Sequence, residues 1–381
     1  MLKLSPSLQT LIVGIYYSAS DCFKIAYLAN APWSGRFKKK IVMSRRSCHV
    51  FKMLPRNLIS LSMTTYWGCV ATHLTDLPPR LTQLALRGCS ILNTSSWESL
   101  PRSLLTSDTG IPPCSDITQM SRLPRHLKSL ILNDSKCEDF NDYLQHMPLT
   151  LTFLQLNSIY NSCESTYIRL LPRSLRGLHI DYARPKNSET TPYILDFSDS
   201  LPQGLVDLKI CVQYFQHADA YIPAKFFMNL PCGLQKLDIS GNLRVEQTIP
   251  QLPPTLTFLN IWPRPVTAID YTCDFDNSFI FSTNLPDSLT HLSLNYQTQW
   301  GDHFVASMPR GLEVLLLPQC PFLTDQSIID LPNHLHWLDL RGSTLLTQSI
   351  ADLLPPGEYP KTLFPYTKGR KQPSVVCRDL T

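Results

Sequence analysis

The sequence predicts an α/β repeat solenoid, in which short units stack into one curved body with a parallel β-sheet on its concave side. We expect short helices, 3-10 turns or loops on the convex side. The first observation is that the same apolar spacing, Leu-x-x-Leu-x-Leu, follows nearly every Leu-Pro or Met-Pro pair. The second is that 43% of the residues are hydrophobic and only 17% are charged, which is enough apolar material for one long core. The third is the regular spacing of the pairs, 22 to 33 residues apart, at Pro55, Pro78, Pro101, Pro124, Pro148, Pro172, Pro202, Pro231, Pro253, Pro286, Pro309, Pro332 and Pro355.

Each unit predicts one β-strand directly after its Leu-Pro corner. The last two leucines of Leu-x-x-Leu-x-Leu are separated by one residue, so in a strand they point to the same face. Proline fixes φ and lacks an N–H group, so it belongs at or before the first residue of a strand. It also holds the preceding leucine extended. A unit therefore directs several large apolar side chains inward, and only stacking against its neighbours can bury them.

The repeat divides the chain into three parts. We expect residues 1–52 to form an N-terminal cap with degenerate repeats. Residues 53–356 are predicted to form the solenoid, with about 12 units of 22–33 residues. Residues 357–381 are predicted to be a basic C-terminal tail, and a second basic stretch lies at 36–46. No run of 18 apolar residues occurs, so we expect no membrane span.

The first residues allow two interpretations. Leu8-x-x-Leu11-x-Val13 fits the strand pattern of the repeat. The same stretch also resembles the apolar part of a signal peptide. The first interpretation predicts one more strand beside the solenoid, and the second predicts secretion.

The segments between strands predict a variable convex side. Pro223 suits the first position of a helix that contains Phe226 and Phe227. The unit after Pro101 departs from the pattern, because Ser107 stands where the second leucine is expected. Three longer intervals indicate insertions at Ala183–Asp199, Gln213–Asn229 and Arg264–Asn284.

The residues between the leucines of each strand face away from the core and therefore cover the concave face. Protein interfaces concentrate their binding energy in aromatic side chains and Arg, and exposed aromatic clusters often mark them. We therefore expect a protein partner to bind a mixed aromatic and charged patch. Its residues are Phe153, His179, Asp181, Lys209, Asp238, Phe258, Trp262 and Trp337.

The twelve cysteines are spread along the chain without any Cys-x-x-Cys pair. Metal sites need closely spaced ligands, so we expect no metal. Two interpretations of the cysteines remain open. They are free, buried thiols in a reducing compartment, or they form disulfides if the chain is secreted.

The Leu-Pro-x-x-Leu-x-x-Leu-x-Leu pattern resembles the leucine-rich-repeat superfamily over about 300 of the 381 residues. Leu171-Pro-Arg-Ser-Leu175 looks like the FNIP-type repeats of amoebae and large viruses, and like the Leu-Pro-rich repeats of some bacterial effectors. The chain lacks the Phe-Asn-x-Pro element of the former, and its units are longer than those of the latter. Leu-x-Leu-x-x-Cys, at Cys89 and Cys320, is similar to the cysteine-containing repeats of F-box proteins.

The resemblance implies a curved leucine-rich-repeat horseshoe that acts as a non-enzymatic protein–protein interaction scaffold. Phosphate loops, Gly-x-Gly-x-x-Gly and His-Glu-x-x-His motifs are absent from the sequence, so we expect no cofactor and no small-molecule substrate. The net charge of +4 gives no reason to expect nucleic acid. The F-box-like repeats imply a substrate-recognition subunit of a ubiquitin-ligase-like complex in the cytoplasm or nucleus. The alternative is a secreted or cell-surface recognition protein with disulfides.

Overall fold

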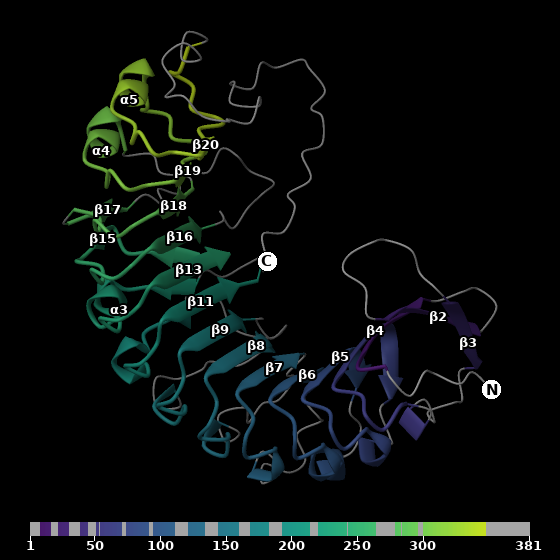
Figure 1. Ribbon diagram of the computed structural model, residues 1–381. Helices are drawn as coiled ribbons and strands as arrows, with labels where there is room; N and C mark the ends of the chain where they lie inside the picture. The colour runs from purple at the N-terminus through teal and green to yellow at the C-terminus, as the bar shows by residue number, and fades with distance from the viewer. Residues whose placement is uncertain are drawn as a thin grey trace.

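The computed structural model shows a curved solenoid whose strands line the inner side of an arc (Figure 1). It describes residues 8–16, 22–29, 39–44, 51–52, 54–70, 74–90, 94–110, 121–133, 144–159, 168–182, 193–213, 220–241, 243–263, 279–282, 284–295 and 300–347. The predicted tail at 357–381 and the side chains of the basic stretch at 36–46 lie outside the described residues. The division into cap, solenoid and tail stays a prediction.

One sheet of 15 strands runs through the described residues. In spatial order its strands are β20 (Trp337–Asp339), β19 (Val314–Leu316), β18 (His291–Leu294), β16 (Phe258–Pro263), β13 (Lys236–Gly241), β11 (Asp207–Val212), β9 (Gly177–Tyr182), β8 (Phe153–Ile159), β7 (Ser129–Asn133), β6 (Thr106–Gly110), β5 (Gln83–Ser90), β4 (Ser60–Val70), β1 (Thr10–Tyr16), β2 (Cys22–Ala29) and β3 (Lys39–Ser44). The neighbours from β20 to β1 are parallel, whereas β2 and β3 pair antiparallel. The predicted solenoid with a parallel sheet is confirmed, and the antiparallel strands at its N-terminal end are an addition to it.

The register of the parallel strands aligns the leucines of successive units. Leu61 of β4 lies opposite Leu84 of β5, and Leu208 of β11 lies opposite Leu237 of β13. These side chains are almost completely buried. Ser107 occupies the same column in β6, where it is buried, and its hydroxyl has no hydrogen-bond partner among the described residues. The aligned columns therefore form one continuous core that tolerates a single small polar residue.

The Leu-Pro corners close with a recurrent turn. Leu175 N donates to Pro172 O over 3.1 Å, and the other anchoring prolines from Pro55 to Pro332 accept in the same way. Two residues after the proline, a Ser or Thr hydroxyl reaches the preceding unit. Ser174 Oγ lies 2.7 Å from Leu149 O and 2.6 Å from Leu151 O, and one proton serves both carbonyls. The same contacts occur at Ser103, Thr150, Thr255 and Ser288.

In the described part of the chain, short helices and two small sheets fill the segments between the strands of the main sheet. The α-helices are α3 (Ala224–Met228), α4 (Asp302–Ala306) and α5 (Asp325–Ile329), and they lie on the outer side of the arc (Figure 1). The 3-10 helices are η2 (Leu74–Asp76), η3 (Thr94–Ser99) and η5 (Ser198–Ser200). The small sheets are β10 (Tyr193–Ile194) with β12 (Ala220–Ile222) and β14 (Leu243–Val245), and β15 (Thr248–Ile249) with β17 (Ile280–Phe281). The helix expected from Pro223 forms, but Pro223 is its N-cap, with extended backbone, and the helix begins at Ala224.

The last two convex helices are linked to the following unit by a repeated contact. Asp302 accepts hydrogen bonds from Thr324 N at 2.8 Å and from Thr324 Oγ1 at 2.6 Å. Asp325 accepts from both groups of Thr347 in the same way. The acidic residue at the start of each helix thus orders the beginning of the next convex segment.

The described end of the third insertion packs against the solenoid. Phe279 is fully buried, and its ring lies edge-to-face with Trp300 at 5.4 Å between centroids. Phe281 stacks on Trp300 at 5.7 Å. Tyr271 and Phe275 of the same insertion lie outside the described residues. The aromatic residues at this end therefore contribute to the convex core.

We expect Ser174→Ala to lower the free energy of unfolding by about 0.5–1.5 kcal/mol, because two corner carbonyls lose their shared donor. Ser174→Thr is the matched control, since Thr150 and Thr255 make the same contacts in other units. Urea unfolding followed by circular dichroism measures both variants. Equal destabilisation by the two substitutions would contradict the role of the hydroxyl.

Candidate partner-binding face

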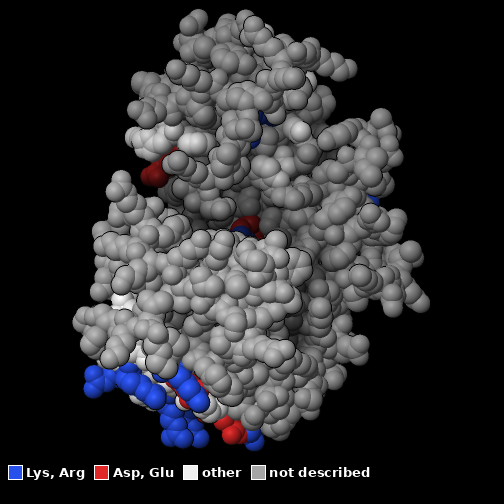
Figure 2. Space-filling model, turned by 90° about the vertical axis from the view of Figure 1, so that its right-hand side faces the viewer, with Lys and Arg blue, Asp and Glu red and all other residues white. Residues whose placement is uncertain are grey.

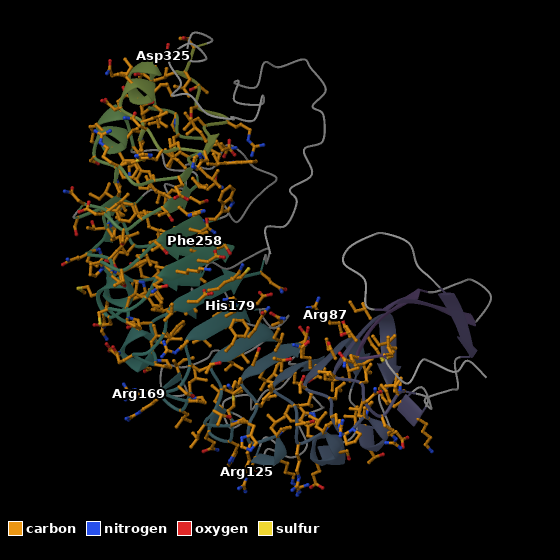
Figure 3. All side chains as sticks on the ribbon, in the orientation of Figure 1. Arg87, Arg125, Arg169, His179, Phe258 and Asp325 are labelled. Carbon is orange, nitrogen blue, oxygen red and sulfur yellow. The ribbon has the colours of Figure 1, made fainter. Side chains whose placement is uncertain are left out.

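All eight residues predicted for the partner patch lie on strands of the concave sheet, and none of them is buried. In β11 and β16 they alternate with buried residues, which directs them away from the core. Figure 3 shows His179 and Phe258 on strands of the inner arc. The structure therefore places these side chains on the expected face, and the binding of a partner there stays a prediction.

Three of these residues form a row across neighbouring strands. His179, Lys209 and Asp238 lie opposite one another on β9, β11 and β13. Lys209 Nζ lies 2.9 Å from Asp238 Oδ2. Asn260, the next residue of the row, donates from Nδ2 to Asp238 Oδ1 over 2.7 Å. Asp238 is thus held by two donors from two different units.

His179 lies between an aromatic ring and a carboxylate. Its ring meets Phe153 edge-to-face, with 4.9 Å between centroids. Its Nε2 atom lies 3.3 Å from Asp207 Oδ1. Gly177 makes room for this arrangement, because a Cβ atom at this position would lie 2.6 Å from Phe153 Cδ2. Sequence reasoning missed this glycine, whose only signal is its place in an outward-facing column of larger residues.

Burial and neighbouring charges shift the pKa values of three ionisable groups on this part of the face. Burial raises the pKa of Asp181, although a hydrogen bond from Gln213 Nε2 at 2.8 Å and the charge of Lys209 act in the opposite direction. Burial and the negative charge of Asp181 raise the pKa of the Cys211 thiol. Burial lowers the pKa of Lys209, but the hydrogen bond and the charge of Asp238 raise it by a larger amount. The net shift of the Lys209 pKa is therefore upward. This part of the face therefore combines a firmly protonated lysine with a thiol that resists ionisation.

Trp337 is separated from the rest of the patch. From Phe258 the row of paired residues continues through His291 and Val314 before it reaches Trp337. Neighbouring strands lie ~4.8 Å apart, so Trp337 is about 14 Å from Phe258 along the sheet. It stands on β20, at the end of the described sheet, and is 51% exposed. The other seven residues share the area from β8 to β16, which we call the concave patch.

A second set of polar residues on the same face forms a hydrogen-bonded network that the sequence did not indicate. Asp108 accepts hydrogen bonds from Arg87 Nε and Asn133 Nδ2, both at 2.6 Å. Asn157 Nδ2 donates to Asn133 Oδ1 over 2.6 Å, and Gln155 Nε2 donates to Asn157 over 3.0 Å. These side chains bind one another across β5 to β8 and have less to offer a partner. Aligning the irregular unit after Pro101 with its neighbours would have placed Asp108 on the concave face.

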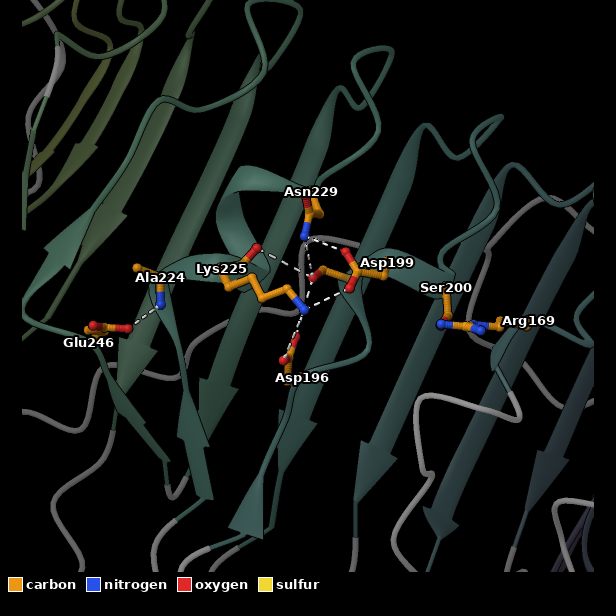
Figure 4. A network of polar contacts seen from close by, with 9 residues as sticks. Arg169, Asp196, Asp199, Ser200, Ala224, Lys225, Asn229 and Glu246 are labelled. Atoms are coloured by element: carbon orange, nitrogen blue, oxygen red, sulfur yellow. Dashed lines mark hydrogen bonds and ion pairs between the residues drawn. The ribbon is translucent and has the colours of Figure 1, made fainter.

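A polar network on the convex side joins three units around α3 (Figure 4). Lys225 Nζ lies 2.7 Å from Asp199 Oδ2, and Asn229 Nδ2 donates to Asp199 Oδ1 over 2.5 Å. Arg169 Nε donates to Ser200 Oγ over 3.0 Å. The hydrogen bond and charge of Asp199, together with Asp196, raise the pKa of Lys225. The network connects the ends of two insertions to neighbouring units.

Among the described residues, no group of three His, Cys, Asp or Glu side chains could hold a metal ion. No helix in the described part of the chain is long and apolar enough to cross a membrane. Cys211 and Cys232 are free thiols.

No known family model and no curated protein sequence matches the chain. Among solved structures, it is similar to an internalin, inlF, from Listeria monocytogenes, with 15% sequence identity and a TM-score of 0.50 over 84% of this chain and 91% of that chain. A circular leucine-rich-repeat protein, CroV588, has 18% identity and a TM-score of 0.40 over 82% of this chain and 43% of that chain. The parallel sheet and the likeness to the internalin show a leucine-rich-repeat solenoid. The FNIP-like or F-box-like subtype is not confirmed by them.

We expect Asp181→Asn to stabilise the protein at neutral pH, because the amide removes the cost of partly burying a carboxylate. A carboxyl with a raised pKa stabilises the folded state most below its ordinary value of 3.8, and this contribution is lost as the pH rises through the raised value. The stability difference should therefore be small near pH 3 and grow towards pH 7, staying under about 1 kcal/mol because solvent screens the charge. Urea unfolding across this range measures it, with Asp287→Asn on an exposed corner as the control. A difference independent of pH would contradict the electrostatic explanation.

Proposed function

We propose that the protein is a non-enzymatic interaction scaffold that binds a protein partner on the concave patch. The observation that carries this proposal is the contrast between two parts of one face. In both parts outward polar groups bind one another, but from β8 to β16 the partly exposed aromatic residues Phe153, Phe258 and Trp262 stand beside them. Leucine-rich-repeat proteins such as internalins support a role in protein binding in general.

The concave patch offers both apolar area and an accessible charged group. Phe258 and Trp262 on β16 supply large rings that a partner would remove from water. The ammonium group of Lys209, whose side chain is 44% exposed, can pair with a carboxylate of the partner and so fix its orientation.

The backbone of the patch takes no part in this recognition. The backbone N–H and C=O groups of β9, β11, β13 and β16 pair with the neighbouring strands. A partner therefore cannot add a strand to the middle of the sheet, and recognition depends on outward side chains. Specificity then follows from the particular residues at the outward positions of each unit.

We propose further that this scaffold is the substrate-recognition subunit of a ubiquitin-ligase-like complex in the cytoplasm or nucleus. The support is the Leu-x-Leu-x-x-Cys units, of which Cys320 is fully buried in the core. Recovery of ubiquitin-ligase subunits with the purified protein tests this role. Thiol titration of the denatured protein tests the alternative, because a secreted protein with disulfides would yield few free thiols.

We expect Trp262→Ala to reduce recovery of the native partner by roughly tenfold or more, because buried interface aromatics commonly contribute at this level. Affinity capture from the source cells, with quantitative mass spectrometry, measures the recovery. Phe322→Ala is the matched control, since Phe322 is an exposed aromatic residue outside the strands of the concave sheet. Trp337→Ala tests whether the partner extends to the end of the sheet. Unchanged recovery by both Trp262→Ala and Lys209→Glu would count against the concave patch.

A further inference from the structure

The corners of the first units carry arginines at or next to the residue that follows the anchoring proline. These residues, which we call the arginine row, are Arg56, Arg80, Arg102, Arg125 and Arg173. All five are exposed, and none forms an ion pair with another described residue. Their charge is therefore available to a partner.

The stacking of the corners brings these arginines into line. Ser103 Oγ lies 2.9 Å from Pro79 O, and Thr150 Oγ1 lies 2.8 Å from Arg125 O, so successive corners are in direct contact. Since neighbouring strands lie ~4.8 Å apart, a cation recurs about every 5 Å except in the unit of Leu149. Figure 3 shows Arg125 pointing outward from the arc, and Figure 2 shows Lys and Arg side chains gathered at the lower edge of one face.

The row is confined to the N-terminal half of the solenoid. In later units the residue after the anchoring proline is Gln203, Cys232, Pro254, Asp287, Arg310 and Asn333. Arg310 is the one arginine in this set, and its guanidinium donates to the carbonyl of Asp330 over 3.1 Å. The mild net charge of the whole chain therefore conceals a local concentration of positive charge.

Exposed aliphatic side chains lie among the arginines. Leu149 occupies the corner position itself and is 81% exposed. Ile59 and Leu105, three residues beyond the arginine of their corners, are 39% and 38% exposed. The exposed large hydrophobic residues among the described parts of these units include no aromatic one. The surface thus offers positive charge and aliphatic contact together.

This combination selects among anionic partners. Proteins that bind single-stranded nucleic acid use aromatic platforms for the bases, which this surface does not show in its described part. A flat anionic membrane would touch only a few units of the curved outline in Figure 1. A polypeptide can follow the curve, and its carboxylates match the two parallel N–H donors of each guanidinium.

We propose that the arginine row binds an acidic polypeptide segment that also carries aliphatic side chains, on a surface separate from the concave patch. The guanidinium groups bind the carboxylates in line, while Leu105 and Leu149 contact the aliphatic side chains. Each exposed charge pair contributes little by itself, so the affinity arises from several pairs and falls as salt is added.

The test uses the full chain and a fluorescein-labelled peptide that alternates Asp and Leu. The combined variant Arg56→Gln, Arg102→Gln, Arg125→Gln and Arg173→Gln should weaken binding by roughly tenfold or more in fluorescence anisotropy. Arg310→Gln, at the same corner position of a later unit, is the matched control and should bind like the wild type. Circular dichroism verifies that each variant is folded. If the combined variant does not fold, the single variant Arg125→Glu replaces it and should also weaken binding of the peptide.

Further measurements separate the contributions. The double variant Leu105→Ser and Leu149→Ser should weaken binding of the Asp-Leu peptide and leave binding of a polyglutamate of equal length unchanged. The proposal is overturned if the wild type does not bind the peptide, or if folded arginine variants bind it as tightly as the wild type. Tighter binding of an oligothymidylate or of phosphatidylserine vesicles than of the peptide would also overturn it, in favour of those partners.

Discussion

The whole structure depends on the register in which each strand stacks on the next. A single unit cannot enclose its own leucines, so every unit relies on two neighbours for burial. A slip of one residue would turn a unit's leucines out of the core and its polar residues in. The alignment of Leu61 with Leu84, and of Leu208 with Leu237, avoids this and keeps the core continuous. In five units a corner hydroxyl bridges the turn to the preceding one and holds the same register from the side.

The same register produces the candidate binding surfaces. Residues at equal positions of successive units become neighbours about 5 Å apart, although more than twenty residues separate them in the sequence. Lys209, Asp238 and Asn260 pair in this way on the concave patch. The arginine row arises by the same rule at the corners, where side chains project from the turn. One repeat thus creates two surfaces of different chemistry, because its outward positions vary independently of its leucines.

In units that carry an insertion or lack one of the leucines, other interactions supplement the leucine columns. The insertions are stabilised by the network around Lys225 and Asp199, and by the aromatic rings of Phe279 and Trp300. Ser107 interrupts a column, and in the same unit Asp108 ties Arg87 to Asn133 by side-chain hydrogen bonds. Irregular units therefore keep their place through polar or aromatic contacts with their neighbours.

The sequence by itself determined the solenoid, the parallel strands, the corners and the face on which each strand residue lies, because these follow from spacing within one unit. It also placed Phe153, Lys209 and Trp262 on the concave face. Only the tertiary structure decided which outward residues bind one another, that Gly177 makes room for Phe153, and that Trp337 stands apart. It also decided the antiparallel pairing of β2 and β3. These features depend on contacts between different units, and the pattern within one unit does not specify which side chains will meet across the stack.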